Sequence, residues 1–317
     1  MGNSIQVICI LLKEKIKRLV VIEGPTASGK SALCVELANY FQTVILSADS
    51  RQFYKELSIG TAKPSIEEQK GISHYFIDSH NITEEVTAAK FAKEASELLE
   101  ILFLKHETII LTGGSGMFID ALCIGLDNIP SSIILRNQLA DEVKREGLSI
   151  LLEELKDKDP VFFEQIDKQN PARVIRAIEA IRLSGLPYSQ LRRATPKRNT
   201  FQLHRFIIEH PREQLYNRIN LRVDNMMDSG LLEEVKTHLP FKHLNALKTV
   251  GYRELFDFID GKTDLETAIE LIKQNSRRYA KRQLTWLKRH EDAKIISFDK
   301  IDLMLNLIVN DLNSQIK

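Results

Sequence analysis

Short apolar runs alternate with amphipathic stretches over the first third of the chain. The runs at residues 18–23, 43–47 and 107–112 have the length and the β-branched composition of buried strands, and residues 73–78 indicate a further strand. Apolar side chains recur at helical spacing over residues 85–105. Strands that alternate with helices, with glycine-rich turns after the strands, predict an α/β fold built on a doubly wound parallel sheet.

The pattern changes after residue 130. Strand signals are missing over the next seventy or so residues, and charged helical segments follow one another at 135–147, 149–156 and 170–184. We therefore expect residues 131–199 to form an all-helical insertion domain in the α/β protein.

The α/β core is then predicted to come from two pieces of the chain, residues 18–130 and 200–317. The second piece begins with an apolar strand and continues as helices, which we place at 203–209 for the strand and at 211–239, about 264–290 and 301–315 for the helices. Residues 1–17 precede the first strand and are interpreted as an N-terminal extension.

The first strand runs directly into a G-x-x-x-x-G-K-S motif that is followed by an amphipathic helix. This order is typical of a phosphate-binding loop, in which successive backbone N–H groups point into one concavity at a helix N-terminus. Lys30 can reach the outer phosphates, and the Ser31 hydroxyl can bind a Mg²⁺ ion that neutralises them. An ordinary glycine-rich turn is the alternative. We predict a P-loop NTPase-like core whose candidate diphosphate- or nucleotide-binding residues are Gly24, Pro25, Thr26, Ala27, Ser28, Gly29, Lys30 and Ser31.

Asp49 follows the second predicted strand and is the candidate general base. The carboxyl ends of parallel strands meet at one edge of a sheet, so Asp49, Lys63 and the Gly113–Gly116 turn should converge on the phosphate loop. A carboxylate there can remove a proton from an acceptor nucleophile while a phosphorylated group is attacked. The alternative is that Asp49 is a helix N-cap.

Overall composition limits the choice of partners. The 317 residues contain 44 Lys and Arg against 43 Asp and Glu, so any surface for nucleic acid has to be local. The three cysteines lack disulfide or zinc spacing, which favours a cytoplasmic protein. The apolar run at residues 5–12 is too short to cross a membrane, and we expect no membrane partner.

A local basic surface is indicated near the C-terminus. Residues 271–290 contain seven Lys and Arg and no acid, together with the only tryptophan of the chain. At helical spacing Arg278, Arg282 and Arg289 share one side, with Tyr279 and the adjacent aromatic and amide positions beside it. The segment is either a solvated charged face or a binding surface for a phosphodiester backbone or a diphosphate.

Taken together, the chain resembles the tRNA dimethylallyltransferase (tRNA isopentenyltransferase) family, bacterial type, whose members prenylate the adenosine 3′ of the tRNA anticodon. The resemblance extends from about Leu19 to Arg289. Seven motifs in the family's order carry it: Gly24–Ser31, Asp49-Ser50 with Gln52 and Tyr54, Gly60–Pro64, Gly113–Ser115, Asn170–Ala177, Val250–Glu254 and Ala280–Trp286.

The resemblance implies dimethylallyl diphosphate on the phosphate loop, Mg²⁺ as cofactor, and tRNA, through its anticodon stem-loop, as partner of a monomeric enzyme. It implies catalytic roles for Asp49 and Lys30, and it places Arg222 on the leaving diphosphate. Arg282, Gln283 and Trp286 are expected to support the cleft. The residues implied to contact tRNA are Asp49, Ser50, Arg51, Gln52, Ser115, Arg136, Ala172, Arg173, Val174, Ile175, Arg176, Lys248, Thr249, Val250, Gly251, Tyr252 and Arg253.

Two other functions are compatible with a phosphate loop. One is a small-molecule kinase that binds ATP on the loop and uses Asp49 as the base. The other is an RNA-binding P-loop protein without transferase activity.

Overall fold

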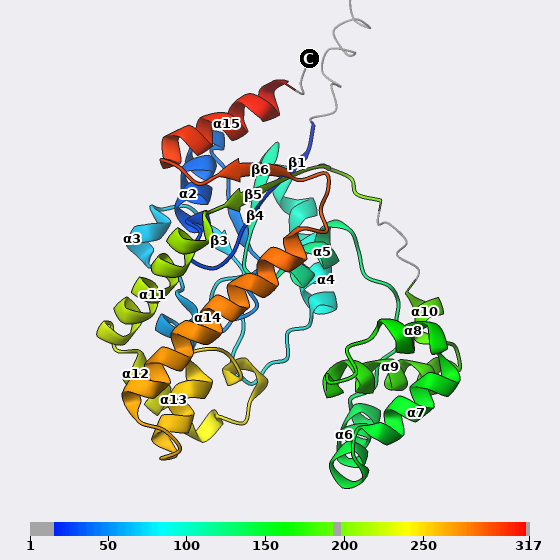
Figure 1. The fold of residues 1–317 in the computed structure, drawn as a ribbon. Helices are drawn as coiled ribbons and strands as arrows, with labels where there is room; N and C mark the ends of the chain where they lie inside the picture. Colours follow the sequence, from blue (N-terminus) through cyan, green and yellow to red (C-terminus); the bar gives the residue numbers. More distant parts are fainter. Residues whose placement is uncertain (1–15, 193–197, 315–317) are drawn as a thin grey trace, which may run out of the picture. The chain divides into compact units, whose positions relative to one another are not determined.

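The computed structural model describes residues 16–192 and 198–314 (Figure 1). The chain divides into two compact units. One contains the residues up to 123 and from 198 onward, and the other contains residues 124–197. The sequence analysis places the corresponding boundaries at 130 and 200. Most of the expected N-terminal extension, residues 1–15, lies outside the described residues.

A parallel sheet forms the centre of the first unit. Its six strands, in the described part of the chain, have the order β3-β2-β4-β1-β5-β6, and every neighbouring pair is parallel. The predicted sheet is therefore confirmed. The strands are β1 (Arg18–Glu23), β2 (Ile45–Ser47), β3 (His74–Tyr75), β4 (Thr108–Thr112), β5 (Gln202–Glu209) and β6 (Lys294–Ser297).

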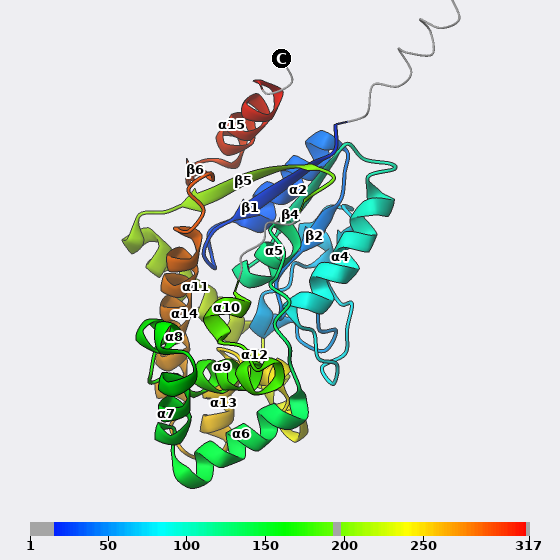
Figure 2. The ribbon, with the colours of Figure 1, turned by 90° about the vertical axis from the view of Figure 1, so that its right-hand side faces the viewer.

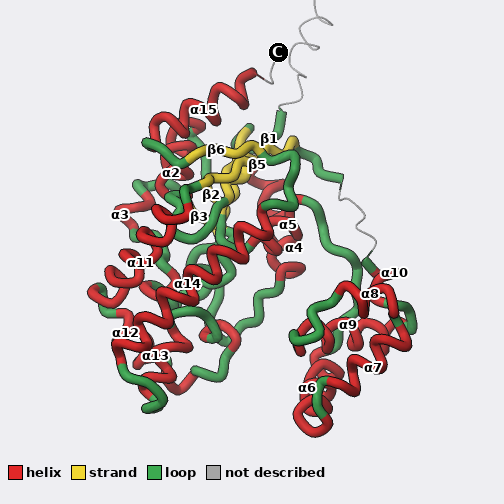
Figure 3. The backbone as a smooth tube through the Cα atoms, viewed as in Figure 1, coloured by secondary structure: helices red, strands yellow, loops and turns green. Residues whose placement is uncertain are grey.

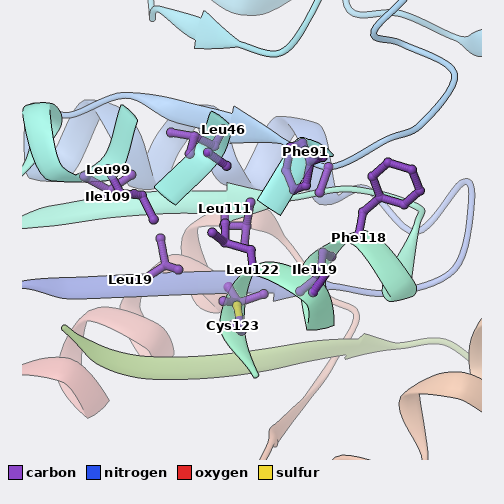
Figure 4. Close-up of a cluster of buried hydrophobic side chains, with 14 of the residues drawn as sticks. Leu19, Leu46, Phe91, Leu99, Ile109, Leu111, Phe118, Ile119, Leu122 and Cys123 are labelled. Atoms are coloured by element: carbon purple, nitrogen blue, oxygen red, sulfur yellow. The ribbon is translucent and has the colours of Figure 1, made fainter. Parts of the chain in front are cut away.

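Helices cover both faces of this sheet, as expected of a doubly wound fold. Alternate residues of β1 explain the arrangement: Leu19 and Val21 pack on one side, and Val20 and Ile22 on the other. The first side is covered by α4 (Ala88–Leu102) and α5 (Gly116–Cys123), as Figures 2 and 4 show. The second is covered by α2 (Lys30–Phe41) and α15 (Ile301–Ser314).

The C-terminal helices of this unit differ from the prediction. The expected helix at 211–239 is broken into α11 (Arg212–Asp228) and α12 (Leu231–Thr237), as Figure 3 shows. Gly230 separates them with a φ of 97°, a left-handed conformation that glycine adopts without steric cost. The long basic helix is α14 (Leu265–Leu287), close to the predicted bounds.

Several short elements of the first unit were not predicted. They are β6 and the helices α3 (Ile66–Gln69), α5 and α13 (Tyr252–Ile259), with the 3₁₀ turns η1 (Ile59–Thr61), η2 (Leu239–Phe241) and η3 (Asn245–Leu247). The strand expected at 73–78 is confined to the two residues of β3. A third apolar cluster joins α11 to α14 and includes Tyr252, Leu231 and Ile272.

In its described residues the second unit contains helices joined by loops and no strand, and it has its own apolar core. Its helices are α6 (Ile133–Glu146), α7 (Ser149–Lys158), α8 (Pro160–Gln165), α9 (Pro171–Ser184) and α10 (Tyr188–Leu191). Of these, α8 and α10 are short and were not expected. No helix in the described part of the chain is long and apolar enough to cross a membrane.

Candidate active site

The G-x-x-x-x-G-K-S segment forms the turn between β1 and α2, as the sequence predicts. Gly29 precedes the first residue of α2 and has a φ of 87°, which a side chain would strain. Its Cα faces the ring of Phe298, since a Cβ at Gly29 would lie 3.2 Å from Phe298 Cε2. Arg218 supports the loop from α11 by donating through Nε to the Ala27 carbonyl at 2.8 Å. The backbone of the loop is thus held from outside by side chains distant in sequence.

Lys30 folds over the loop. Its ammonium group donates to the carbonyls of Gly24 at 2.9 Å and Pro25 at 2.7 Å. Burial, together with the nearby positive charge of Arg222, lowers the pKa of Lys30 to about 8, against the opposing effect of Asp49. Lys30 therefore keeps its positive charge at neutral pH, close to the concavity that an anion would fill.

Asp49 follows β2 after Ala48 and lies opposite the turn that follows β4. A Cβ placed on Gly114 would lie 2.8 Å from Asp49 Oδ2 and 3.1 Å from Gln283 Nε2, so these groups border one space. Asp49 caps a turn and not a helix, because its Oδ1 accepts the backbone N–H of Arg51 at 3.1 Å and no helix follows. The helix N-cap alternative is wrong, and one carboxylate oxygen remains next to Gly114.

The helix α14 links the phosphate loop to the turn after β4. Gln283 accepts the backbone N–H of Thr26 at 2.8 Å and donates to the Gly114 carbonyl at 2.8 Å. Tyr279 donates to the same carbonyl at 3.0 Å. One amide side chain thus ties both turns to a single helix. From the sequence, periodicity gives the helix face on which Gln283 lies, and the family resemblance implies that Gln283 supports the cleft.

A cavity of about 270 Å³ opens beside these residues. Its polar edge includes Ser50, Ser115, Gln283 and the glycines of the two turns, and Ser115 donates to the Ser50 hydroxyl at 2.9 Å. Its apolar wall is formed by Met117, Phe118, Trp286 and Leu287, and Arg282 lies at its edge. The cavity can therefore receive a ligand with one charged end and one small apolar end.

Buried charges lie behind this cavity. Arg205 donates to Glu23 Oε2 at 2.8 Å and to Asp120 Oδ1 at 3.1 Å. Trp286 Nε1 donates to the other oxygen of Asp120 at 2.8 Å, which orients the indole of the cavity wall. Burial raises the pKa of Glu23 to about 7, although Arg205 opposes the shift. This network is not visible in the sequence, because its three charged members come from separate strands and helices and form no motif.

Arg222 of α11 lies within electrostatic range of both Lys30 and Asp49. Burial lowers its pKa, while Asp49 and then Glu68 favour the charged form. The three residues with predicted catalytic roles are therefore neighbours. Two cations and one carboxylate gather where a diphosphate and an acceptor could meet.

The residues predicted to contact tRNA differ in exposure within the first unit. Arg253 and Lys248 are exposed. Arg51 donates to the carbonyls of Asn245 at 2.9 Å and Ala246 at 3.3 Å. Tyr252 is fully buried, so its side chain serves packing and not a surface contact.

In the second unit, Arg173 and Ala172 are exposed on α9, whereas Val174 and Ile175 belong to the apolar core. Arg136 and Arg176 both bind the fully buried carboxylate of Glu179, at 3.1 and 2.8 Å. These two arginines therefore have a structural role within the unit, whatever else they contact.

Replacing Arg176 by alanine should accordingly destabilise the second unit. Arg176 also donates to the carbonyls of Pro130 at 2.7 Å and Ile129 at 3.0 Å, so several acceptors would lose their donor. We expect a loss of about 1–3 kcal/mol in the free energy of unfolding, measured by urea denaturation. Arg173→Ala, on the exposed side of the same helix, is the matched control. Equal stability of the two variants would contradict the structural role.

Proteins of known identity share this architecture. The tRNA dimethylallyltransferase of Cytophaga hutchinsonii is 47% identical over 279 residues, which cover 88% of this chain and 92% of the relative. The tRNA dimethylallyltransferase 1 of Bacteroides thetaiotaomicron is 45% identical over 277 residues, or 87% and 90% of the two chains. Among solved structures, the full-length tRNA isopentenylpyrophosphate transferase of Bacillus halodurans matches with a TM-score of 0.69 and 33% identity, covering 94% and 97%.

The fold and the site define a transferase built on a P-loop-like α/β core. The model of the family described as IPP transferase matches residues 52–290. This chain belongs to that family.

Proposed function

We propose that the protein transfers the dimethylallyl group of dimethylallyl diphosphate to the exocyclic amine of the adenosine 3′ of the tRNA anticodon, and releases diphosphate. One observation carries this proposal beyond the family assignment. Gln283 joins the phosphate loop to the Gly114 turn, and the Oδ2 atom of Asp49 borders that turn. A diphosphate on the loop and a base for the acceptor would thus share one site.

The two ends of the donor match two parts of the site. The loop N–H groups, Lys30 and Arg222 supply positive charge for the diphosphate. The wall formed by Phe118, Trp286 and Leu287 offers apolar surface to the five-carbon group. Excluding water there would also protect the reacting carbon from hydrolysis.

The reaction transfers one proton and replaces a C–O bond by a C–N bond. Asp49 accepts a proton from the exocyclic amine, the nitrogen forms a bond to C1 of the dimethylallyl group, and the C1–O bond to the diphosphate breaks. The electron pair of that bond leaves with the diphosphate. Lys30 and Arg222 stabilise the charge that develops on it.

Mg²⁺ fits this site as an ion held mainly by the substrate. In the described part of the chain no cluster of His, Cys, Asp or Glu forms a protein-only metal site. The Ser31 hydroxyl is exposed at the start of α2, and Mg²⁺ commonly takes few protein ligands beside phosphate oxygens and water. When bound, the ion would neutralise diphosphate charge, and Ser31 is the residue that would hold it.

The acceptor has to leave its base stack to reach Asp49. Anticodon loops suit this requirement, because unpaired bases can be turned outward into an enzyme pocket. The exposed cations Arg278, Lys281 and Arg282 of α14, with Arg289 just after the helix, can bind the phosphates around such a base.

If Arg173 and Arg253 contact tRNA phosphates, each alanine variant should weaken tRNA binding and reduce its salt dependence. The slope of log K against log salt should fall by roughly 0.7–0.9 for each lost contact. Filter binding over a salt series measures both quantities. Arg145→Ala, which removes an exposed cation from α6, is the control. Unchanged slopes in both variants would make these arginines ordinary surface residues.

The proposed function is tested by incubating the protein with labelled dimethylallyl diphosphate and unmodified tRNA. Parallel reactions contain ATP with small acceptors, or tRNA alone. We expect label in the tRNA, on the adenosine 3′ of the anticodon. Phosphorylation of a small acceptor would instead indicate a kinase, and tRNA binding without label transfer would indicate a binding protein.

A further inference from the structure

Two of the family motifs, Gly60–Pro64 and Val250–Glu254, have no role in the proposed reaction, and both contact the carboxylate of Glu234. Glu234 of α12 reaches the η1 turn, where its Oε2 accepts the backbone N–H groups of Ile59 at 2.8 Å and Ser58 at 3.2 Å. Its Oε1 accepts the N–H of Gly60 at 3.0 Å and the hydroxyl of Tyr252. Four donors from two distant segments therefore converge on Glu234. Successive N–H groups of a turn form a natural anion site, here filled by a protein carboxylate.

Close packing fixes the turn in this position. A Cβ on Gly60 would lie 2.5 Å from Tyr252 Cε2 and 2.9 Å from Leu231 Cδ1, so only glycine allows the approach. Tyr252 is fully buried. Burial and the charge of Glu234 both raise the pKa of Tyr252, which keeps its hydroxyl a donor. The turn cannot move away from α12 without leaving the half-buried carboxylate of Glu234 short of donors.

The η1 turn also holds the side chain of Gln52. The side-chain amide of Gln52 donates to the carbonyls of Thr61 and Ala62, both at 3.1 Å. Both amide hydrogens are thereby used, and within the described residues Oε1 has a single long contact, 3.4 Å to the Ser47 hydroxyl. Gln52 is also joined to the candidate base, because its backbone N–H donates to the Asp49 carbonyl at 3.1 Å.

We infer that Glu234 is a positioning residue that determines how Gln52 is presented beside Asp49. Glu234 fixes the turn at residues 58–62, and this turn fixes the side-chain amide of Gln52. The oxygen Oε1 of Gln52 is therefore the group that remains to accept a hydrogen bond from a ligand. This inference rests on the proposed function, in which the target is an exocyclic amine. An amine donates hydrogen bonds, so a fixed acceptor favours adenine over a purine that carries an oxygen at the same position.

The test uses Glu234→Gln in the full-length protein, with Glu233→Gln as the matched control. Glu233 is the adjacent residue of α12, but its side chain is 72% exposed and, among the described residues, forms an ion pair only with Lys236. We expect Glu234→Gln to lower kcat/KM for an anticodon stem-loop by roughly tenfold to a hundredfold, because a displaced group near the chemistry costs about that much. The KM for dimethylallyl diphosphate should stay as in the wild type. Wild-type kcat/KM for the stem-loop would overturn the inference.

A comparison of four proteins separates a positioning role of Glu234 from a general effect on stability. Stem-loops with adenosine or inosine at the target position are compared for binding, in the wild type, Glu234→Gln, Gln52→Met and the double variant. If Glu234 acts through Gln52, each single variant reduces the preference for adenosine, and the double variant reduces it no further. Additive losses, or an unchanged preference in Glu234→Gln, would overturn the inference.

Failure of the proposed function would be recognised separately, as a wild-type protein that does not label tRNA. The hydrogen bonds that link Glu234 to Gln52 are then examined by NMR, through the exchange of their hydrogens with solvent. In Glu234→Gln the backbone amides of residues 58–60 and the side-chain NH₂ of Gln52 should exchange faster with solvent, while Glu233→Gln leaves them protected. Retained protection of the Gln52 amide in Glu234→Gln would overturn the positioning role.

Discussion

Asp49→Asn should slow the chemical step by about 10²–10⁴-fold, the usual cost of losing a general base. Asparagine has the same shape and can still accept the N–H of Arg51, so the turn after β2 should persist. It cannot take a proton from the amine. Single-turnover measurements with saturating enzyme give the rate of this step, and tRNA affinity should change little.

The result is informative in both directions. A chemical step of wild-type rate in Asp49→Asn would reduce Asp49 to a residue that stabilises the turn. A loss of tRNA affinity with an unchanged step would make it a binding residue.

Lys30→Ala should lower kcat/KM by about 10²–10³-fold, the cost commonly seen when a donor to developing negative charge is removed. Lys30 loses a proton near pH 8 in the free protein, so affinity for diphosphate should fall as the pH rises through 8. The alanine variant should lack this pH dependence. Calorimetric titration with diphosphate between pH 6.5 and 9, an interval on either side of that pKa, measures the affinity of both proteins and its pH dependence.

The fold of Lys30→Ala should remain intact. Among the residues that the structure describes, the hydrogen bonds of the ammonium group stay within its own loop. A strongly lowered Tm would therefore show that Lys30 holds the loop together, and would remove it from the list of ligand-binding residues.

Much of the fold followed from local pattern. β1 and β4 were predicted because strands covered on both faces have continuous apolar residues, and β5 was predicted from its shorter apolar run at residues 206–208. β6 was missed because it has four residues and three of them are exposed. The break between α11 and α12 depends on one backbone conformation at Gly230, and the amphipathic pattern continues across it.

The site was predictable where one segment carries the chemistry. The phosphate loop needs a fixed order of neighbouring residues, so the sequence displays it. Glu234 could not be found in this way, because three of its four donors are backbone N–H groups that every residue has. The pairing of Arg136 and Arg176 with Glu179 was hidden for another reason: charged residues on a helix usually face solvent, and only the packed structure shows a buried carboxylate between them.

Trp286 is the only tryptophan of the chain, and it lies in the wall of the cavity with its N–H fixed on Asp120. The intrinsic fluorescence of the whole protein therefore comes largely from one point, next to the space that the ligand would occupy. An optical signal can report the filling of this cavity in stopped-flow mixing, without a dye or an introduced label. Trp286 is thus a built-in probe with which the order of substrate binding can be followed.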